Sequence, residues 1–235
     1  MEDIDVNFDF RFDSHGKDPD VYSPTLKKYH KILWSKPLPN GKMFNLRDDK
    51  AGTYLCHKSE LGEFFLGSDT IGHSYKNHKR KQWLTRQIPE AVNEVYSAAC
   101  TIGATIIFPN NRIDNKQTIN GARGCNAKID DRFDLTLECI RRFYLGLTSP
   151  LHEVLSRYRN FFGLFRDFHS YVDFFLLQDL VTHNYKEINF YLPFDNFMSV
   201  PNFRGVDEYL VYKKKVIDFI NKRNNRIDKM CKGGT

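Results

Sequence analysis

The segment from Asn120 to Gly124 combines a basic side chain with two glycines. Glycine lets a backbone approach a ligand closely, and the planar guanidinium of Arg123 can pair with a phosphate or carboxylate through two hydrogen bonds. The spacing matches neither the P-loop nor the dinucleotide-binding fingerprint. We expect Asn120 and Arg123 to lie in a loop that contacts a phosphate. The alternative is a structural ion pair between Arg123 and an aspartate of the helix that follows.

Positive charge is concentrated in two segments of the chain, whose net charge is +6. Residues 70–89 contain five basic residues and no acid, and residues 204–235 contain nine basic and four acidic residues. A basic face attracts phosphates, so we expect Lys79, Arg80 and Lys81 to contact a nucleotide or a nucleic acid. The N-terminus is acidic, and mutual neutralisation of these segments across the folded surface is the alternative.

Two groups of carboxylates have spacings that suit catalysis or cation binding. The polar side of an alternating segment carries Asp5, Asp9, Arg11 and Asp13. Asp131, Asp134 and Glu138 share one face of a predicted helix. Paired carboxylates can act as general acid and base or hold Mg²⁺, so we treat Asp9, Arg11, Asp134 and Glu138 as catalytic candidates. A solvated strand face and a helix with acids near its N-terminus explain the same residues.

His30 is the remaining catalytic candidate, as a general base beside the Trp34 ring. A histidine buried and hydrogen-bonded in the helix core is the alternative. The eight histidines and five cysteines lack the spacings of a zinc site, so we expect no zinc, and no metal ligand is assigned. No familiar hydrolase or protease motif occurs. The cofactor is unknown, and Mg²⁺ is the candidate that the carboxylates suggest.

Composition is typical of a soluble globular protein, with 41% hydrophobic and 27% charged residues. No apolar run reaches the roughly 18 residues that a membrane span needs, and the N-terminus is acidic where a signal peptide is basic. Five cysteines without a close pair favour a reducing compartment. We therefore expect a cytoplasmic protein without membrane contact. Twenty Phe and twelve Tyr indicate a core built on rings, with a base-stacking surface as the alternative.

Elements of the first half are predicted from periodicity and turn residues. Alternation over residues 3–13 predicts a strand with Ile4, Val6, Phe8, Phe10 and Phe12 on its inner face. Ser23 and Pro24 predict the start of a helix. Further on, we expect a hairpin over 43–57, a strand over 63–66, a helix within 82–100, a strand over 101–108 and a long loop over 109–128.

The second half is predicted to be helical, with helices over 131–145, 151–162, 165–181 and 206–229 and a short strand over 187–192. The fold class is therefore α+β, with residues 1–235 forming a single domain. In it, a strand-rich half (1–128), made of antiparallel hairpins and a helix, packs on a helix-rich half (129–235).

Several long strings resemble a known family. They comprise residues 8–13, 29–30, 33–36, 38–41, 119–124, 131–142 and 174–181. The chain resembles, over nearly its whole length, a bacterial family of uncharacterised proteins of roughly 230 residues. That family has no assigned activity, so the resemblance implies no catalytic residues.

Three functions are consistent with these patterns. The first is a phosphate-ligand protein that binds a nucleotide or nucleic acid through the basic segments and the Arg123 loop. The second is a hydrolase or transferase of unrecognised type, with carboxylates and arginine in one cleft. The third is a non-catalytic interaction protein, for instance of a toxin or phage-defence system, whose exposed rings bind a protein partner. Salt-dependent binding to nucleic acid would favour the first.

Overall fold

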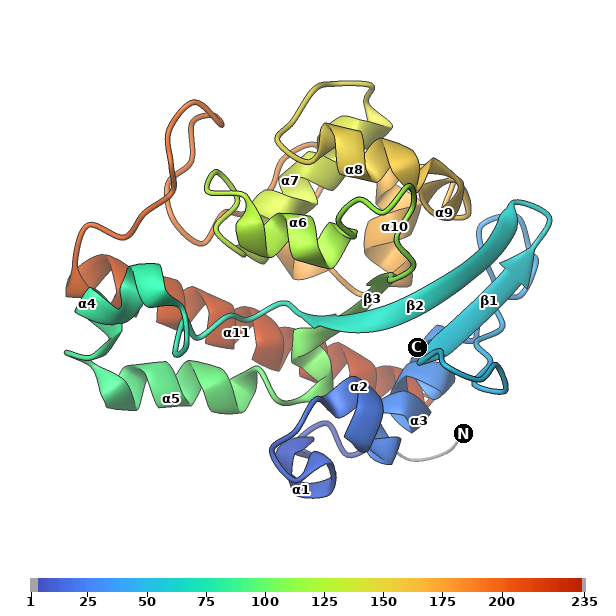
Figure 1. The fold of residues 1–235 in the computed structure, drawn as a ribbon, viewed down its shortest axis with the longest axis horizontal. Helices are drawn as coiled ribbons and strands as arrows, with labels where there is room; N and C mark the ends of the chain where they lie inside the picture. The colour runs from blue at the N-terminus through green and yellow to red at the C-terminus, as the bar shows by residue number, and fades with distance from the viewer. Residues whose placement is uncertain (1–3, 234–235) are drawn as a thin grey trace.

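The computed structural model describes residues 4–233 (Figure 1). Its strands are β1 (Leu55–Ser59), β2 (Gly62–Thr70) and β3 (Thr105–Pro109). Its α-helices are α1 (Arg11–Ser14), α2 (Pro19–Tyr22), α3 (Pro24–Trp34), α4 (Gln82–Thr85), α5 (Pro89–Ala98), α6 (Ile119–Cys125), α7 (Phe133–Tyr144), α8 (His152–Arg157), α9 (Arg159–Gly163), α10 (Phe168–Phe174) and α11 (Val206–Cys231). Three short 3₁₀ helices are η1 (Lys79–Lys81), η2 (Ile102–Ala104) and η3 (Gln178–Leu180).

The sheet is antiparallel, in the order β1-β2-β3. β1 and β2 form a hairpin in which Ser59 pairs with Gly62 and Leu55 with Leu66. β3 pairs with the far end of β2, from Leu66 to Thr70. Within residues 4–233, no strand pairs with β2 beyond Leu66 on the β1 side. The last residues of β2 therefore have a free edge, which is open to hydrogen bonds from other elements.

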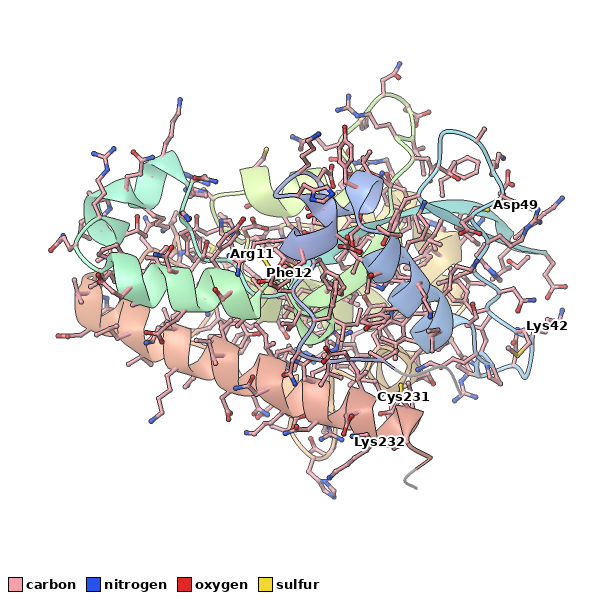
Figure 2. All side chains as sticks on the ribbon, turned by 90° about the horizontal axis from the view of Figure 1, so that it is seen from below. Arg11, Phe12, Lys42, Asp49, Cys231 and Lys232 are labelled. Carbon is pink, nitrogen blue, oxygen red and sulfur yellow. The ribbon has the colours of Figure 1, made fainter. Side chains whose placement is uncertain are left out.

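Helices cover the sheet from two sides (Figure 1). Helices α6 to α10 lie above it, whereas α1 to α3, α5 and α11 lie below, and the view from below places these lower helices side by side (Figure 2). Buried apolar residues of both halves form one cluster, rich in rings such as Trp34, Phe44, Phe165 and Phe175. The predicted α+β class, with its sheet in the first half and a helical second half, is confirmed, as is the ring-built core.

The predicted N-terminal strand is wrong. Asp3, its first residue, lies outside the described residues, and residues 4–10 form turns that lead into α1. Asp9 accepts a hydrogen bond from the backbone N–H of Arg11 at 2.8 Å, which favours a helix start over an extended chain. The rings of Phe8 and Phe10 pack against Tyr29, whereas the Phe12 side chain is 76% exposed. Local side-chain-to-backbone bonds thus prevail over the alternating pattern.

Two other predictions for the first half need correction. The hairpin predicted over 43–57 is reduced to one bridge between Arg47 and Cys56. The reason is that β1 pairs with β2, the strand that follows it in the sequence. The predicted loop 109–128 contains α6, whose N-cap Thr118 accepts a hydrogen bond from the backbone of Gly121. The predicted helix start at Ser23 is confirmed, since its side chain accepts from the backbone of Leu26.

In the second half, α7 and α11 lie where helices were predicted, whereas the helices between them are shorter than predicted. The helix predicted over 151–162 is divided at Tyr158, and the next one ends at Phe174. Residues 187–192 form no strand, only a bridge between Val181 and Ile188. No helix within residues 4–233 is both long and apolar enough to span a membrane.

Candidate functional site

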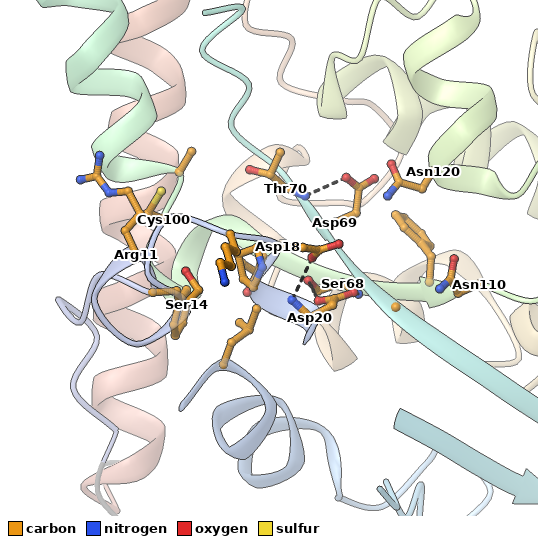
Figure 3. Close-up of a pocket in the computed structure, with 18 of the residues that line it drawn as sticks. Arg11, Ser14, Asp18, Asp20, Ser68, Asp69, Thr70, Cys100, Asn110 and Asn120 are labelled. Carbon is orange, nitrogen blue, oxygen red and sulfur yellow. Dashed lines mark hydrogen bonds between the residues drawn. The ribbon is translucent and has the colours of Figure 1, made fainter. Parts of the chain in front are cut away.

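A pocket of about 430 Å³ lies where the free edge of β2 meets the N-terminal helices (Figure 3). The loop between α1 and α2 forms one wall, the ends of β2 and β3 form the floor, and α5 and α6 contribute single side chains. Its polar lining residues are Arg11, Ser14, Lys17, Asp18, Asp20, Ser68, Asp69, Thr70, Tyr96, Thr105, Asn110 and Asn120. The volume of the pocket is in the range of small-molecule sites, and its polar side chains could orient a ligand.

Asp20 occupies the free edge of β2. One of its carboxylate oxygens accepts from the backbone N–H of Ser68 at 2.8 Å, and the other accepts from the Ser68 hydroxyl. Burial raises the pKa of Asp20, and the two donors of Ser68 oppose that rise. The carboxyl group is therefore held at a defined place in the pocket and is easier to protonate than an exposed aspartate.

Asp69 follows Ser68 in strand β2. Its carboxylate accepts from the backbone N–H of Thr70 at 2.8 Å and from Arg123. With its amide nitrogen turned toward Asp69, Asn120 donates to the two oxygens at 3.0 and 3.1 Å. Burial raises the pKa of Asp69 to about 6, although Arg123 opposes the rise. With donors on both oxygens, the carboxylate of Asp69 is an acceptor held at a fixed place in the pocket.

Arg123 lies on α6 and is fully buried behind Asp69. Its guanidinium also donates to the Thr136 hydroxyl at 2.8 Å and lies 3.6 Å from a carboxylate oxygen of Asp131. The predicted glycine loop is thus a helix, and Arg123 makes buried ion pairs, whereas Asn120 on the same helix lines the pocket. Thr118, the N-cap, is the sequence signal for this helix, which the predicted loop did not include.

Ser14 lies at the end of α1 and is fully buried. It is one of the residues that line the pocket, and its buried hydroxyl has no hydrogen-bond partner among residues 4–233. Buried hydroxyls in proteins are nearly always hydrogen-bonded, to protein, to water or to a ligand. Ser14 therefore has an unused donor and acceptor beside the pocket, and neither its burial nor its position was predicted from the sequence.

Arg11 and Lys17 bring positive charge to the pocket. The Arg11 guanidinium pairs with Asp9 through Nε at 2.9 Å and lies 5.0 Å from the centre of the Tyr96 ring. The bond from Asp9 raises the pKa of Arg11, which remains charged. Of the predicted pair, Arg11 thus lines the pocket, and Asp9 lies behind it as its partner.

The basic segment Lys79–Lys81 forms η1, and its three side chains have different surroundings. Lys81 is buried, with its Nζ 2.6 Å from a carboxylate oxygen of Asp130, and Arg80 lies 3.6 Å from the same aspartate. Lys79 is exposed. The segment therefore presents Lys79 and Arg80 to solvent, whereas Lys81 belongs to a buried ion pair outside the pocket.

The acidic face of α7 is occupied by arginines. Asp134 is fully buried and pairs with Arg132 at 2.5 Å, and Glu138 pairs with both Arg141 and Arg142 at 2.7 Å. These ion pairs favour a structural role for the acidic residues of this face. Neither carboxylate lines the pocket described above.

His30 is fully buried in the lower helical layer. Its Nδ1 accepts a hydrogen bond from the Trp34 indole at 2.9 Å. Burial lowers the pKa of His30 to about 3, with a further contribution from Arg223, so the ring is neutral. It does not line the pocket. No group of three or more His, Cys, Asp or Glu side chains in the part of the chain that the structure describes is placed to hold a metal ion.

Comparison with known proteins gives a family but no activity. Residues 4–227 match the model of a family of unknown function, DUF6994. No curated protein and no solved structure matches the chain. The matched range includes every element that lines the pocket. The chain therefore belongs to this family of unknown function, DUF6994, as its resemblance to an uncharacterised family predicts.

Proposed function

We propose that the protein binds a nucleoside phosphate in the pocket between the α1–α2 loop and the end of β2. The observation that carries this proposal is Ser14, a lining residue of the pocket whose buried hydroxyl has no hydrogen-bond partner among residues 4–233. A built site with an unused polar group favours a ligand that completes its hydrogen bonds. The volume of about 430 Å³ is in the range of small-molecule sites.

The order of side chains along the pocket supports a nucleotide in particular. Figure 3 shows Arg11 and Ser14 at one end, Asp20 in the middle, and Asn110 and Asn120 at the other end. Arginine and serine suit a phosphate, a carboxylate suits sugar hydroxyl groups, and amides can both donate to and accept from a base. This order follows the phosphate, ribose and base of one ligand.

A nucleotide fits the charges better than an extended nucleic acid does. Several cations of the basic C-terminal helix form ion pairs. Lys213 pairs with Glu94 at 2.6 Å, and Arg226 pairs with Asp179 at 2.7 Å. Lys81 is likewise occupied by Asp130. Counterion release by a phosphate backbone needs many free cations, so these pairs weaken a nucleic-acid interface. Neutralisation within the folded surface thus uses much of the predicted basic charge.

Isothermal titration calorimetry tests the proposal with the four common ribonucleoside monophosphates and with inorganic phosphate. We expect Ser14→Ala and Arg11→Met each to weaken nucleotide binding at least tenfold, because a hydrogen bond to a charged group contributes about 1.5–3 kcal/mol. The titrations are run with and without Mg²⁺, since carboxylates beside a phosphate can share that ion.

The matched control is the double variant Lys79→Met and Arg80→Met, which removes two cations outside the pocket. It should leave nucleotide affinity unchanged. The proposal fails if no nucleotide binds. It also fails if Ser14→Ala binds like the wild type while the double variant loses affinity, because the ligand would then contact the basic segment.

A further inference from the structure

We propose that Asn120 selects the base of the bound nucleoside phosphate, by accepting a hydrogen bond from an exocyclic amino group such as that of adenine or cytosine. This inference rests on the nucleotide binding proposed above and adds the class of base to it. It depends on one geometric feature of the pocket, the contact between the Asn120 amide and the carboxylate of Asp69. Asp69 acts as a positioning residue, whereas Asn120 contacts the ligand.

The carboxylate of Asp69 is held from two sides. Its Oδ1 accepts from the backbone N–H of Thr70 at 2.8 Å, and its Oδ2 accepts from the guanidinium of Arg123. Arg123 is fully buried and donates in turn to the Thr136 hydroxyl at 2.8 Å. Because donors of the protein already reach both oxygens, Asp69 is an acceptor at a fixed place on the pocket wall.

This carboxylate fixes the orientation of Asn120, which lies in the first turn of α6. The amide nitrogen lies 3.0 and 3.1 Å from the two oxygens of Asp69 and donates to both. In the reverse orientation the amide oxygen would face two carboxylate oxygens, and three acceptors would then meet without a proton between them. Since Asp69 occupies the amide nitrogen, the carbonyl oxygen of Asn120 is the atom that remains for a ligand.

A fixed acceptor distinguishes bases by the group that they place opposite it. Adenine and cytosine carry an amino group, which donates, where hypoxanthine and uracil carry a carbonyl oxygen, which accepts. A carbonyl oxygen facing Asn120 would leave two acceptors in contact and no hydrogen bond. A site built to hydrogen-bond an N–H group rejects the analogue that lacks it, because the polar group of the site is then left unpaired.

Asn110, the second amide at this end of the pocket, lacks such a constraint (Figure 3). It lies against Gly67, where an added Cβ would come 3.0 Å from its amide nitrogen. Among residues 4–233, no side-chain hydrogen bond fixes which way this amide points. Asn110 can therefore present either its N–H or its C=O to a base, and it contributes affinity without distinguishing an amino group from a carbonyl.

Isothermal titration calorimetry with two pairs of ligands tests the selection: AMP with inosine monophosphate (IMP), and CMP with UMP. The first ligand of each pair carries the amino group, and the second carries a carbonyl in its place. We expect the pair that binds more tightly to show a preference of roughly tenfold or more for its amino member. In Asn120→Ala this preference should disappear. Asn120 is an exposed residue, so this variant should fold like the wild type.

Two further variants separate positioning from a general loss of affinity. Asp69→Asn removes one of the two acceptors that hold the Asn120 amide and lets it turn over, so the preference should again disappear. Damage to the fold alone would weaken both members of a pair equally and leave the preference intact. Asn110→Ala is the matched control, because it removes the amide that no neighbour orients. It should weaken the binding of both members and keep the preference.

The outcomes distinguish this inference from the proposed function. Equal affinities within both pairs, or a preference for the carbonyl member, would overturn the selection and leave the proposed nucleotide binding intact. A preference that persists in Asn120→Ala, or one that is lost in Asn110→Ala, would also overturn it. Absence of binding by all four nucleotides would overturn both proposals.

Discussion

Replacing Arg123 with methionine is expected to lower the free energy of unfolding by about 3–5 kcal/mol at pH 7, the usual cost of breaking a buried ion pair from one side. Arg123 is fully buried between Asp69 of β2 and Asp131, which precedes α7. Methionine fills a similar volume but carries no charge. Both carboxylates would then lack the cation that stabilises them, and urea denaturation measures the loss.

The loss should depend on pH. Without the guanidinium, the pKa of Asp69 should rise above its present value of about 6. A carboxyl group whose folded-state pKa lies above its unfolded value stabilises the protein at low pH, and this contribution is lost as the pH rises through the folded-state pKa. The difference between the variant and the wild type should therefore shrink when the pH is lowered from 7 to 5.

Arg166 provides the matched control, because it also pairs with an aspartate, Asp167 at 3.0 Å, but its side chain is 71% exposed. Arg166→Met should change stability by less than about 1 kcal/mol. Replacing Asp69 and Arg123 together should lower the free energy of unfolding by less than the sum of the two single losses. In the double variant no buried charge of this pair is left without its partner. Equal losses in Arg123→Met and Arg166→Met would contradict the buried-pair interpretation.

Arg223→Met is expected to lower the free energy of unfolding by a similar amount, about 3–5 kcal/mol, for a different reason. Arg223 on α11 is fully buried, and its four hydrogen bonds all go to backbone carbonyls. They join Phe175, at the end of α10, to Gly103 of η2 and to Thr105, the first residue of β3, over distances of 2.7–3.1 Å. Loss of the guanidinium would leave three carbonyl groups without these donors, and thermal and urea denaturation would show the effect.

Arg223→Lys should restore little of the stability, because one ammonium group cannot reproduce the planar fork that reaches two elements. Burial lowers the pKa of Arg223 to about 9, so the side chain remains charged at neutral pH. Arg226, one turn along α11, pairs with Asp179 at the surface and is 43% exposed. Arg226→Met is the matched control and should cost less than about 1 kcal/mol. Full stability of Arg223→Met would show that the carbonyl groups find other donors.

Features that depend on neighbouring residues were predictable from the sequence. Ser23 and Pro24 marked the start of α3 because a cap is a contact within one helical turn. The long α11 was predicted for a similar reason, since its apolar residues repeat with the period of a helix. Where a competing local bond existed, as between Asp9 and the backbone of Arg11, the alternating pattern alone was misleading.

The candidate site was only partly predictable. Asn120 and Arg11 were named from the sequence and do line the pocket, but Asp20, Asp69 and Ser14 were not. Asp20 and Asp69 are single acids without a motif around them. Their surroundings come from Ser68 and Arg123, residues 48 and 54 positions further along the chain.

By itself the sequence determined the α+β class, the ring-rich core, the main helices and the membership of an uncharacterised family. Each of these depends on composition, on contacts within a few residues or on strings that resemble a family. Tertiary structure alone decided which charges are buried, so that Arg123 pairs with Asp69 while Asp20 occupies the free edge of β2. The physical reason is that the sequence does not show whether a charged side chain contacts water or a distant partner. Burial beside such a partner, which shifts the pKa of the group, is set by the tertiary structure.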